Sequence, residues 1–551
     1  MASAGAQTRA GGEFQVNTYS TGFQWYPAVA LSPSGGFFVV WEDTAGLDGD
    51  GVAVMGRRYD PAGAPLGSPF VVNTTTASAE WMPSVYSDPR GGFIAAWSRT
   101  TSAGAVIDAQ RFDPAGRRQG GEFQISTYAP DILTAPVVAF DGAGNFVAVW
   151  VAQLQDSLST GIYSQRFDAS GARLGTEFRV NSYTSSNQQT PSVIRDPAGG
   201  FVIAWQSTGQ DGFAVLALAQ RFDAAGGRVG AEFRLGEGTI QSRPTLARRA
   251  DGGFVATWMG ADGSGDGVFA RRFDAAGTPQ GPEFLVNQET LNQQFWPGLS
   301  ADATGNFTVA WTSYTQGAAG FDIKAARCRA GGQRRGSDFL VNTYTQGDQY
   351  VNVNAPTLAS DPSGNFVVVW TSLGQDGSGY GVFAQRHGGL VPVGANVETG
   401  AGLNGVLEPG ETVDVRPSWR NVNGVAQTFT GTLAELTGPA GAVYTINDAS
   451  AAYGTVANGA SAPCSDCYVV SVSAPAVRPA AHWDAVGVEV LAPDTQGQVK
   501  RWPLHIGSSF ADVPASSPFY RFVETLLHRG VTAGCTATTY CPASATTREQ
   551  M

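Results

Sequence analysis

Five aspartates in glycine-rich loops have the type and spacing for cation chemistry. They alternate with Gly or Ser and are Asp48, Asp50, Asp262, Asp266 and Asp376. Calcium needs several oxygen ligands on a tightly curved backbone, and such loops provide them. None of the loops has the terminal Glu of an EF-hand, and Asp, Gly and Ser also form ordinary turns. Calcium is therefore the one cofactor that the sequence suggests, with plain turns as the alternative.

A set of aromatic residues provides a second candidate site, for ligand binding. Its members are Trp25, Tyr26, Trp81, Trp296 and Tyr350. Aromatic rings beside acidic and amide groups suit sugars or peptides. Because Trp25, Trp81 and Trp296 each stand next to or near a repeated proline, the alternative is that some of them fill the interior of the fold.

Catalytic signatures are missing from the sequence, so we name no catalytic residue and expect a protein that is not an enzyme. The four histidines are 387, 482, 505 and 528, and no nucleophile elbow, paired metal histidine or phosphate loop accompanies them. Cys464 and Cys467 form a C-x2-C pair without a second ligand pair, which favours a disulfide or free thiols over zinc. We expect His482 to be an ordinary strand residue and Cys328 to be buried.

Composition limits the classes of partner. The chain has 551 residues and a formal charge of −12, with 71 Gly, 30 Pro and only 15% charged residues. This charge argues against nucleic acid or an anionic membrane surface as the main partner. No apolar run approaches the roughly 20 residues of a membrane span. Residues 1–12 have no apolar signal core, so we expect any export signal to be absent or removed.

A tryptophan repeat organises the first 390 residues. Each Trp closes a short apolar run, each has a Pro 14 residues before it, and successive Trp residues are 53 to 59 residues apart. The seven are Trp41, Trp97, Trp150, Trp205, Trp258, Trp311 and Trp370. Four short strands per unit and seven units predict a seven-bladed β-propeller over residues 13–388. We expect the Trp residues to pack between blades rather than to bind ligand.

The phase of the repeat predicts how the ring closes. Residues 13–17 are an orphan outer strand and the seventh unit ends without one, so the N-terminal strand completes the last blade. A repeated Arg lies 11 residues before an acid in most units, as in Arg111 and Glu122, which predicts cross-strand salt bridges and a pair between Arg386 and Glu13. The connections of variable length share one face, where binding is expected.

Two further segments follow residue 388, so the fold class is all-β with a short helical end. Residues 389–507 contain alternating strands at 411–416, 468–473 and 486–490, which predict an immunoglobulin-like β-sandwich. Within 508–551, residues 518–530 form an amphipathic pattern that ends at Gly530 and predict a helix.

The last segment resembles an S-layer homology domain. The resemblance rests on Phe510-Ala-Asp-Val-Pro514, the helix, Gly530-Val-Thr-Ala-Gly534 and Thr547-Arg548. Such domains occur in three tandem copies that attach proteins to cell-wall polysaccharide. The chain holds one copy, which stops where a second helix is due, so we expect a truncated chain or an incomplete anchor. The resemblance implies Arg548 as a wall-binding residue, and Cys535 and Cys541, which depart from the motif, as a loop disulfide.

These patterns together predict an exported bacterial cell-surface protein. The propeller repeats resemble those of large secreted bacterial surface proteins, and the paired cysteines suit an oxidising, extracellular setting. We expect the propeller to be a non-catalytic adhesion platform for a surface polysaccharide or protein. The alternatives are a secreted propeller glycoside hydrolase or lyase, and a self-assembling surface-layer subunit.

Overall fold

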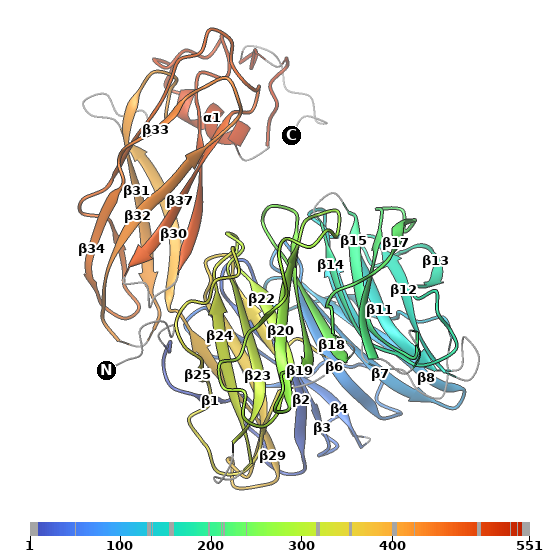
Figure 1. The fold of residues 1–551 in the computed structure, drawn as a ribbon. Coiled ribbons are helices and arrows are strands. Elements are labelled where there is room, and N and C mark those ends of the chain that lie inside the picture. Colours follow the sequence, from blue (N-terminus) through green and yellow to red (C-terminus); the bar gives the residue numbers. More distant parts are fainter. Residues whose placement is uncertain are drawn as a thin grey trace. The chain divides into compact units, whose positions relative to one another are not determined.

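The structure is a computed structural model with two compact units, Met1–Gly389 and Leu390–Met551 (Figure 1). It describes residues 9–542 except 50, 129–133, 135, 154–158, 197–198, 211, 213–214, 239, 316–319, 352–354, 399–404, 424, 493–497, 529–530 and 537. Asp50 and Arg548 therefore lie outside the described residues.

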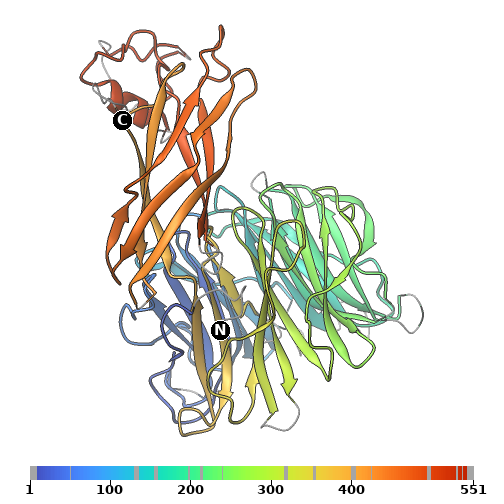
Figure 2. The ribbon, with the colours of Figure 1, turned by 60° about the vertical axis from the view of Figure 1, so that its left-hand side comes forward.

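The first unit is a seven-bladed β-propeller, as predicted. Its described residues form seven antiparallel sheets, visible as successive blades in Figures 1 and 2. Six sheets follow the chain from the inner strand outward and are called blades one to six. Their strands are β2 (Gln24–Leu31), β3 (Phe37–Asp43), β4 (Ala53–Tyr59), β5 (Phe70–Val71); β6 (Glu80–Ser87), β7 (Phe93–Thr101), β8 (Gly104–Phe112), β9 (Arg118–Gln124); β10 (Val137–Phe140), β11 (Phe146–Gln153), β12 (Thr160–Phe167), β13 (Arg173–Arg179); β14 (Gln188–Arg195), β15 (Phe201–Thr208), β16 (Val215–Phe222), β17 (Arg228–Arg234); β18 (Gln241–Arg248), β19 (Phe254–Ala261), β20 (Asp266–Phe273), β21 (Phe284–Leu285); β22 (Gln294–Ala301), β23 (Phe307–Thr315), β24 (Gly320–Cys328) and β25 (Phe339–Leu340).

Blade seven is closed by the N-terminal strand. Its sheet contains β26 (Gln349–Tyr350), β27 (Leu358–Ser360), β28 (Phe366–Leu373), β29 (Tyr380–His387) and β1 (Phe14–Gln15). Phe14 pairs with Ala384, and the Asn17 side chain extends the ladder by accepting a hydrogen bond from the Val382 amide at 2.8 Å. The predicted closure is confirmed, and it gives β29 an outer partner strand.

The repeated tryptophans belong to the core. All seven are at most 1% exposed and pack in clusters that combine neighbouring blades, such as Trp150 of blade three with Ile94 and Ile107 of blade two. Trp205 also donates a hydrogen bond from Nε1 to Gln188 Oε1 at 2.9 Å. The packing role predicted for them is confirmed.

The predicted salt bridge within each blade is wrong for Arg111 and Glu122. The register of β8 and β9 shifts between Ala109 and Arg111, and Arg111 faces Gln119 rather than Glu122. The guanidinium reaches the next blade, where Nη1 donates to the Ala169 carbonyl at 2.6 Å. Arg58 and Arg166 likewise donate to carbonyls in the outer turn of the next blade.

The same correction applies where the ring closes. Arg386 donates to the carbonyls of Pro61 and Ala62 in blade one, and Glu13 accepts from Thr343 in blade six, so the predicted pair of Arg386 with Glu13 is wrong.

The repeated acidic residues connect their own blade to the preceding blade. Glu122 Oε2 of blade two accepts the Thr74 amide of blade one at 2.7 Å, and Glu177 Oε2 of blade three accepts the Thr127 amide of blade two at 2.8 Å. We call these contacts acid latches. Blade one has Pro69 at the equivalent position, so it carries no latch there.

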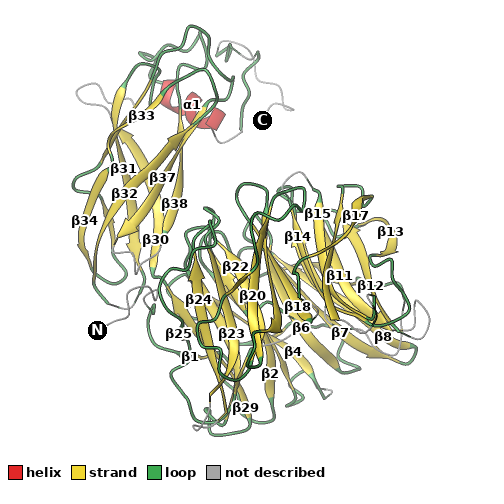
Figure 3. Cartoon of the chain, viewed as in Figure 1, coloured by secondary structure: helices red, strands yellow, loops and turns green. Residues whose placement is uncertain are grey.

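The second unit consists of two antiparallel sheets around one core, with a helix at its end (Figure 3). Its largest fully buried side chains are Trp419, Trp483, Tyr468 and Tyr520. The immunoglobulin-like connectivity stays a prediction. One sheet contains β30 (Leu390–Glu398), β31 (Thr412–Asn421), β33 (Tyr444–Asp448), β35 (Ser461–Pro463) and β36 (Tyr468–Val472), the other contains β32 (Gln427–Thr437), β34 (Ser450–Val456), β37 (Asp484–Ala492) and β38 (Val499–His505), and the helix is α1 (Tyr520–His528).

Candidate functional site

A bulge in the inner strands turns one residue of several blades out of the regular ladder. Register shifts lie just before the repeated prolines, for example between Ser242 and Thr245 in β18. The residue preceding the proline has positive φ, which is uncommon outside glycine and costs of order 1–3 kcal/mol. These residues are Tyr26, Met82, Thr190, Arg243 and Trp296, with φ between 47 and 55°. Such repeated strain marks the inner end of the blades as a candidate site.

The strained residues are held from the preceding blade. The amide of Met82 donates to Glu42 Oε2 at 3.1 Å, and the amide of Arg243 donates to Gln206 Oε1 at 3.3 Å. Glu42 and Gln206 both directly follow a repeated tryptophan. In these two cases the residue after the Trp therefore positions the bulge of the next blade.

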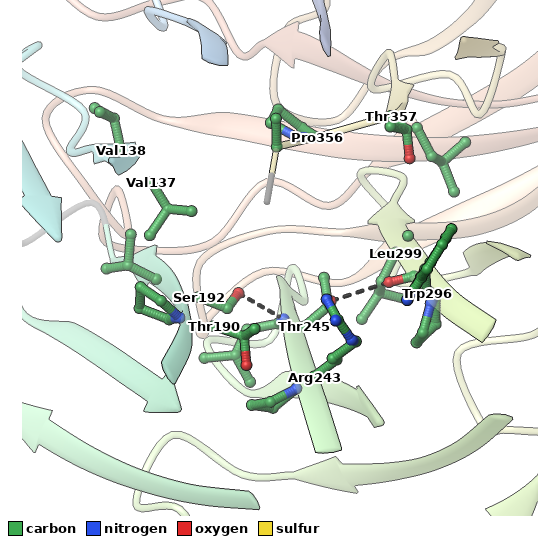
Figure 4. A pocket seen from close by; sticks show the side chains of 18 of the residues that line it. Val137, Val138, Thr190, Ser192, Arg243, Thr245, Trp296, Leu299, Pro356 and Thr357 are labelled. Atoms are coloured by element: carbon green, nitrogen blue, oxygen red, sulfur yellow. Dashed lines mark hydrogen bonds between the residues drawn. The ribbon is translucent and has the colours of Figure 1, made fainter. Parts of the chain in front are cut away.

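The inner strands enclose a cavity of about 250 Å³ (Figure 4). Thr190, Arg243 and Trp296 line it together with several of the repeated prolines. Ser192 and Thr245 also line it, but their hydroxyls are used: Ser192 Oγ accepts the Leu246 amide at 3.0 Å, and Thr245 Oγ1 donates to the Pro297 carbonyl at 3.1 Å.

Three polar groups at the cavity have no hydrogen-bond partner among the described residues. They are Tyr86 Oη, Thr190 Oγ1 and Arg243 Nη1, and all three atoms are buried. The Arg243 guanidinium lies over the Trp296 ring at 5.8 Å from its centroid, and burial lowers the pKa of Arg243. Buried polar groups normally have hydrogen-bond partners, so these three are available to a ligand.

The structure divides the predicted aromatic site. The ring centroids of Trp25 and Tyr26 are 5.7 Å apart, and those of Trp296 and Tyr350 are 6.0 Å apart. Each pair has further aromatic rings around it. Trp81 is 39% exposed and donates from Nε1 to Thr100 Oγ1 at 3.3 Å. Of these five residues, Trp296 lines the cavity.

Two buried carboxyls were missed by the sequence analysis. Burial raises the pKa of Glu42 to about 7, against the opposing effect of the Met82 amide. Burial and then the charge of Asp48 raise the pKa of Glu80 to about 8. The available signal for Glu42 was an acidic residue in strand β3 directly after the repeated Trp41, a signal that its neighbour Asp43 shares.

The predicted calcium loops are built as turns. Asp262 Oδ1 accepts the amides of Ser264 and Gly265 at 3.0 and 3.1 Å, and Asp376 Oδ1 accepts the Ser378 amide at 3.1 Å. Burial and then the charge of Asp262 raise the pKa of Asp266.

Asp48 accepts a hydrogen bond from Asn73 at 2.8 Å. Within the described part of the chain, the loop aspartates do not converge in groups of three with other His, Cys, Asp or Glu ligand atoms. Calcium binding stays a prediction.

The cysteines form two disulfides, Cys464 with Cys467 and Cys535 with Cys541. Cys328 is free and buried in β24, and burial raises the pKa of its thiol to about 12.

Solved structures with similar folds are β-propellers. A protein of unknown function from Dyadobacter fermentans is 14% identical over 59% of this chain and 98% of its own, with a TM-score of 0.42. The α-L-arabinanase of Penicillium chrysogenum is 13% identical over 61% and 98%, with a TM-score of 0.41. The propeller domain of the trilobed protease from Pyrococcus furiosus is 10% identical over 67% and 94%, with a TM-score of 0.40. No curated protein matches the chain.

The C-terminal segment has a family match. Residues 509–551 match the S-layer homology domain, in agreement with the resemblance noted in the sequence. Among the described residues, no helix has the length and apolar character to cross a membrane. The S-layer homology match indicates a protein of the cell surface.

Proposed function

We propose that the propeller binds an acidic saccharide at the cavity around Arg243, while the C-terminal domain attaches the protein to a cell-wall polymer. The observation that carries this proposal is the pair of unpartnered buried groups, Thr190 Oγ1 and Arg243 Nη1, beside the Trp296 ring. A guanidinium binds a carboxylate or sulfate through parallel N–H donors, and an indole packs against the apolar face of a sugar.

The size and charge of the cavity support a single sugar unit as the occupant. Its volume of about 250 Å³ is just below the range of roughly 300–1,000 Å³ for typical ligand pockets. Arg243 is the one charged side chain among the described lining residues. A local positive group in a protein of charge −12 selects a short acidic group rather than a long polyanion.

The test is binding of the full chain to matched oligosaccharides by calorimetry. We expect a uronic-acid oligosaccharide to bind and its neutral counterpart to bind at least tenfold more weakly. Arg243→Gln removes the difference, whereas Arg117→Gln, a change in an exposed outer turn, leaves it intact. Equal binding of both sugars, or no effect of Arg243→Gln, contradicts the proposal.

Wall attachment is tested separately with purified cell-wall sacculi. We propose Arg548 as the wall contact, so Arg548→Ala lowers the bound fraction while Arg243→Gln does not. The two variants separate the anchor from the propeller site, and the opposite pattern contradicts the assignment.

The second candidate function is cleavage of a polysaccharide, and Glu42 is the observation in its favour. A carboxyl with a pKa of about 7 suits a general acid in glycoside hydrolysis. Release of new sugar ends from uronic-acid polymers by the wild type, and its loss in Glu42→Gln, would replace the binding proposal. Unchanged polymers support binding alone.

A further inference from the structure

Three of the four histidines in the chain gather at one end of the second unit. His482 precedes β37, His505 ends β38 and His528 ends α1, so three separate elements supply them. They surround Asp484, the first residue of β37, which lies opposite His505 in the strand ladder. One ligand atom from each of the four side chains lies within 4.8 Å of all the others.

The contacts around Asp484 have the dimensions of a metal site. Its carboxylate lies 3.1 Å from His482 Nε2, 2.9 Å from His505 Nδ1 and 3.2 Å from His528 Nδ1. Ligands about 2.0–2.1 Å from a tetrahedral zinc ion are separated from one another by about 3.3 Å. A small outward movement of these side chains therefore makes room for the ion.

Glu524 supplies the outer contact typical of a metal-bound histidine. Its Oε2 lies 2.7 Å from His505 Nε2, and Glu524 also accepts the Ser509 amide at 2.9 Å and the Ser509 hydroxyl at 2.7 Å. The carboxylate is buried, so its position is fixed. A proton held on Nε2 by Glu524 leaves Nδ1 of His505 as the metal ligand.

We propose that His482, Asp484, His505 and His528 form a zinc(II) site, with Glu524 orienting His505. Three imidazoles and one carboxylate are borderline ligands that suit zinc better than calcium or magnesium. The His482 side chain is 43% exposed, whereas the His505 side chain is only 9% exposed. An ion therefore enters from solvent at His482 and binds against the buried His505.

The site connects two parts of the unit that the sequence separates. His482, Asp484 and His505 precede the S-layer homology match at 509–551, whereas His528 and Glu524 lie within it. A bound ion therefore fastens α1 to strands β37 and β38. This inference is independent of the function proposed for the propeller.

The alternative occupant of this cluster is protons, with charged imidazoles paired to Asp484 and no metal. To separate the two, the full chain is stripped of metal and titrated with cobalt(II), then with zinc. We expect the visible absorption of tetrahedral cobalt at one equivalent per chain, and its displacement by one equivalent of zinc. Absence of the tetrahedral spectrum overturns the proposal.

Variants locate the site. His528→Ala and His482→Ala lose the cobalt spectrum, and the exposed His482 serves if His528→Ala fails to fold. Glu524→Gln keeps the spectrum but weakens zinc binding about 10- to 100-fold. Asp414→Asn, a change at an exposed ion pair of the same unit, has no effect. Circular dichroism without metal checks the fold, and zinc binding that persists in both histidine variants refutes the assignment.

Discussion

Replacing Glu42 by Gln is expected to stabilise the propeller in a pH-dependent way. The ordinary pKa of 4.5 applies in the unfolded chain, and the folded value is about 7. Because one pKa unit corresponds to about 1.36 kcal/mol, deprotonating Glu42 in the fold costs about 3 kcal/mol. Because the pKa of Glu42 is raised in the fold, Glu42 makes a contribution to the free energy of unfolding that is complete below pH 4.5. That contribution is lost as the pH rises through 7.

The substitution isolates this charge because blade four already has the amide. Gln206 occupies the equivalent position and accepts the Arg243 amide at 3.3 Å, so Gln at 42 can accept the Met82 amide in the same way. The quantity to compare is the free energy of unfolding of Glu42→Gln minus that of the wild type. We expect this difference to be about 3 kcal/mol larger at pH 8.5 than at pH 4.

The assay is urea unfolding of the full chain, followed by tryptophan fluorescence at pH 4, 6, 7 and 8.5. The exposed Glu435→Gln in the second unit controls for a general change in net charge. A stability difference that does not change between pH 4 and 8.5 would refute the conclusion that burial holds Glu42 protonated. If the stability difference from the wild type changes equally with pH in Glu42→Gln and Glu435→Gln, net charge alone is responsible.

Three further changes test other parts of the structure. Glu122→Ala removes an acid latch to the Thr74 amide and should cost about 1 kcal/mol in urea unfolding, while Glu122→Gln should cost less because its oxygen still accepts. Glu489→Ala should abolish folding of the second unit as seen by circular dichroism, because four buried Tyr and Trp donors lose their shared acceptor at about 1–3 kcal/mol each; a folded variant contradicts this. Added calcium should raise the thermal midpoint of the EDTA-treated chain if the Asp262 loop binds it, and Asp262→Asn should lower that rise; an unchanged midpoint returns the loop to a turn.

Local chemistry was sufficient to predict the propeller. The constant 14-residue distance from Pro to Trp reflects a fixed hairpin, and each Trp fills the same space between blades, so spacing alone gave seven blades and their closure. The aromatic candidates were predicted in part: Trp296 lines the cavity, whereas Trp25 lies in a separate ring cluster.

The roles of Arg243 and Glu42 could not be derived from the sequence because they depend on burial. Arg243 has positive φ at the bulge in β18, and only the assembled ring leaves its buried Nη1 without a hydrogen-bond partner. An acid 11 residues from Arg111 suggested a pair, but the strand register places Arg111 opposite Gln119, and both side chains contact neighbouring blades instead.

Residue types and their spacing were sufficient to predict the strand pattern, the blade count, the ring closure and the type of the C-terminal domain. Those features depend on local spacing and side-chain polarity, which can be read directly from the amino-acid sequence. Tertiary structure alone decided which distant side chains meet, as with His482 and His528, which are 46 residues apart and both contact Asp484. The physical reason is that contact and burial depend on packing of whole elements, so the pKa of Glu42 and the histidine cluster exist only in the folded chain.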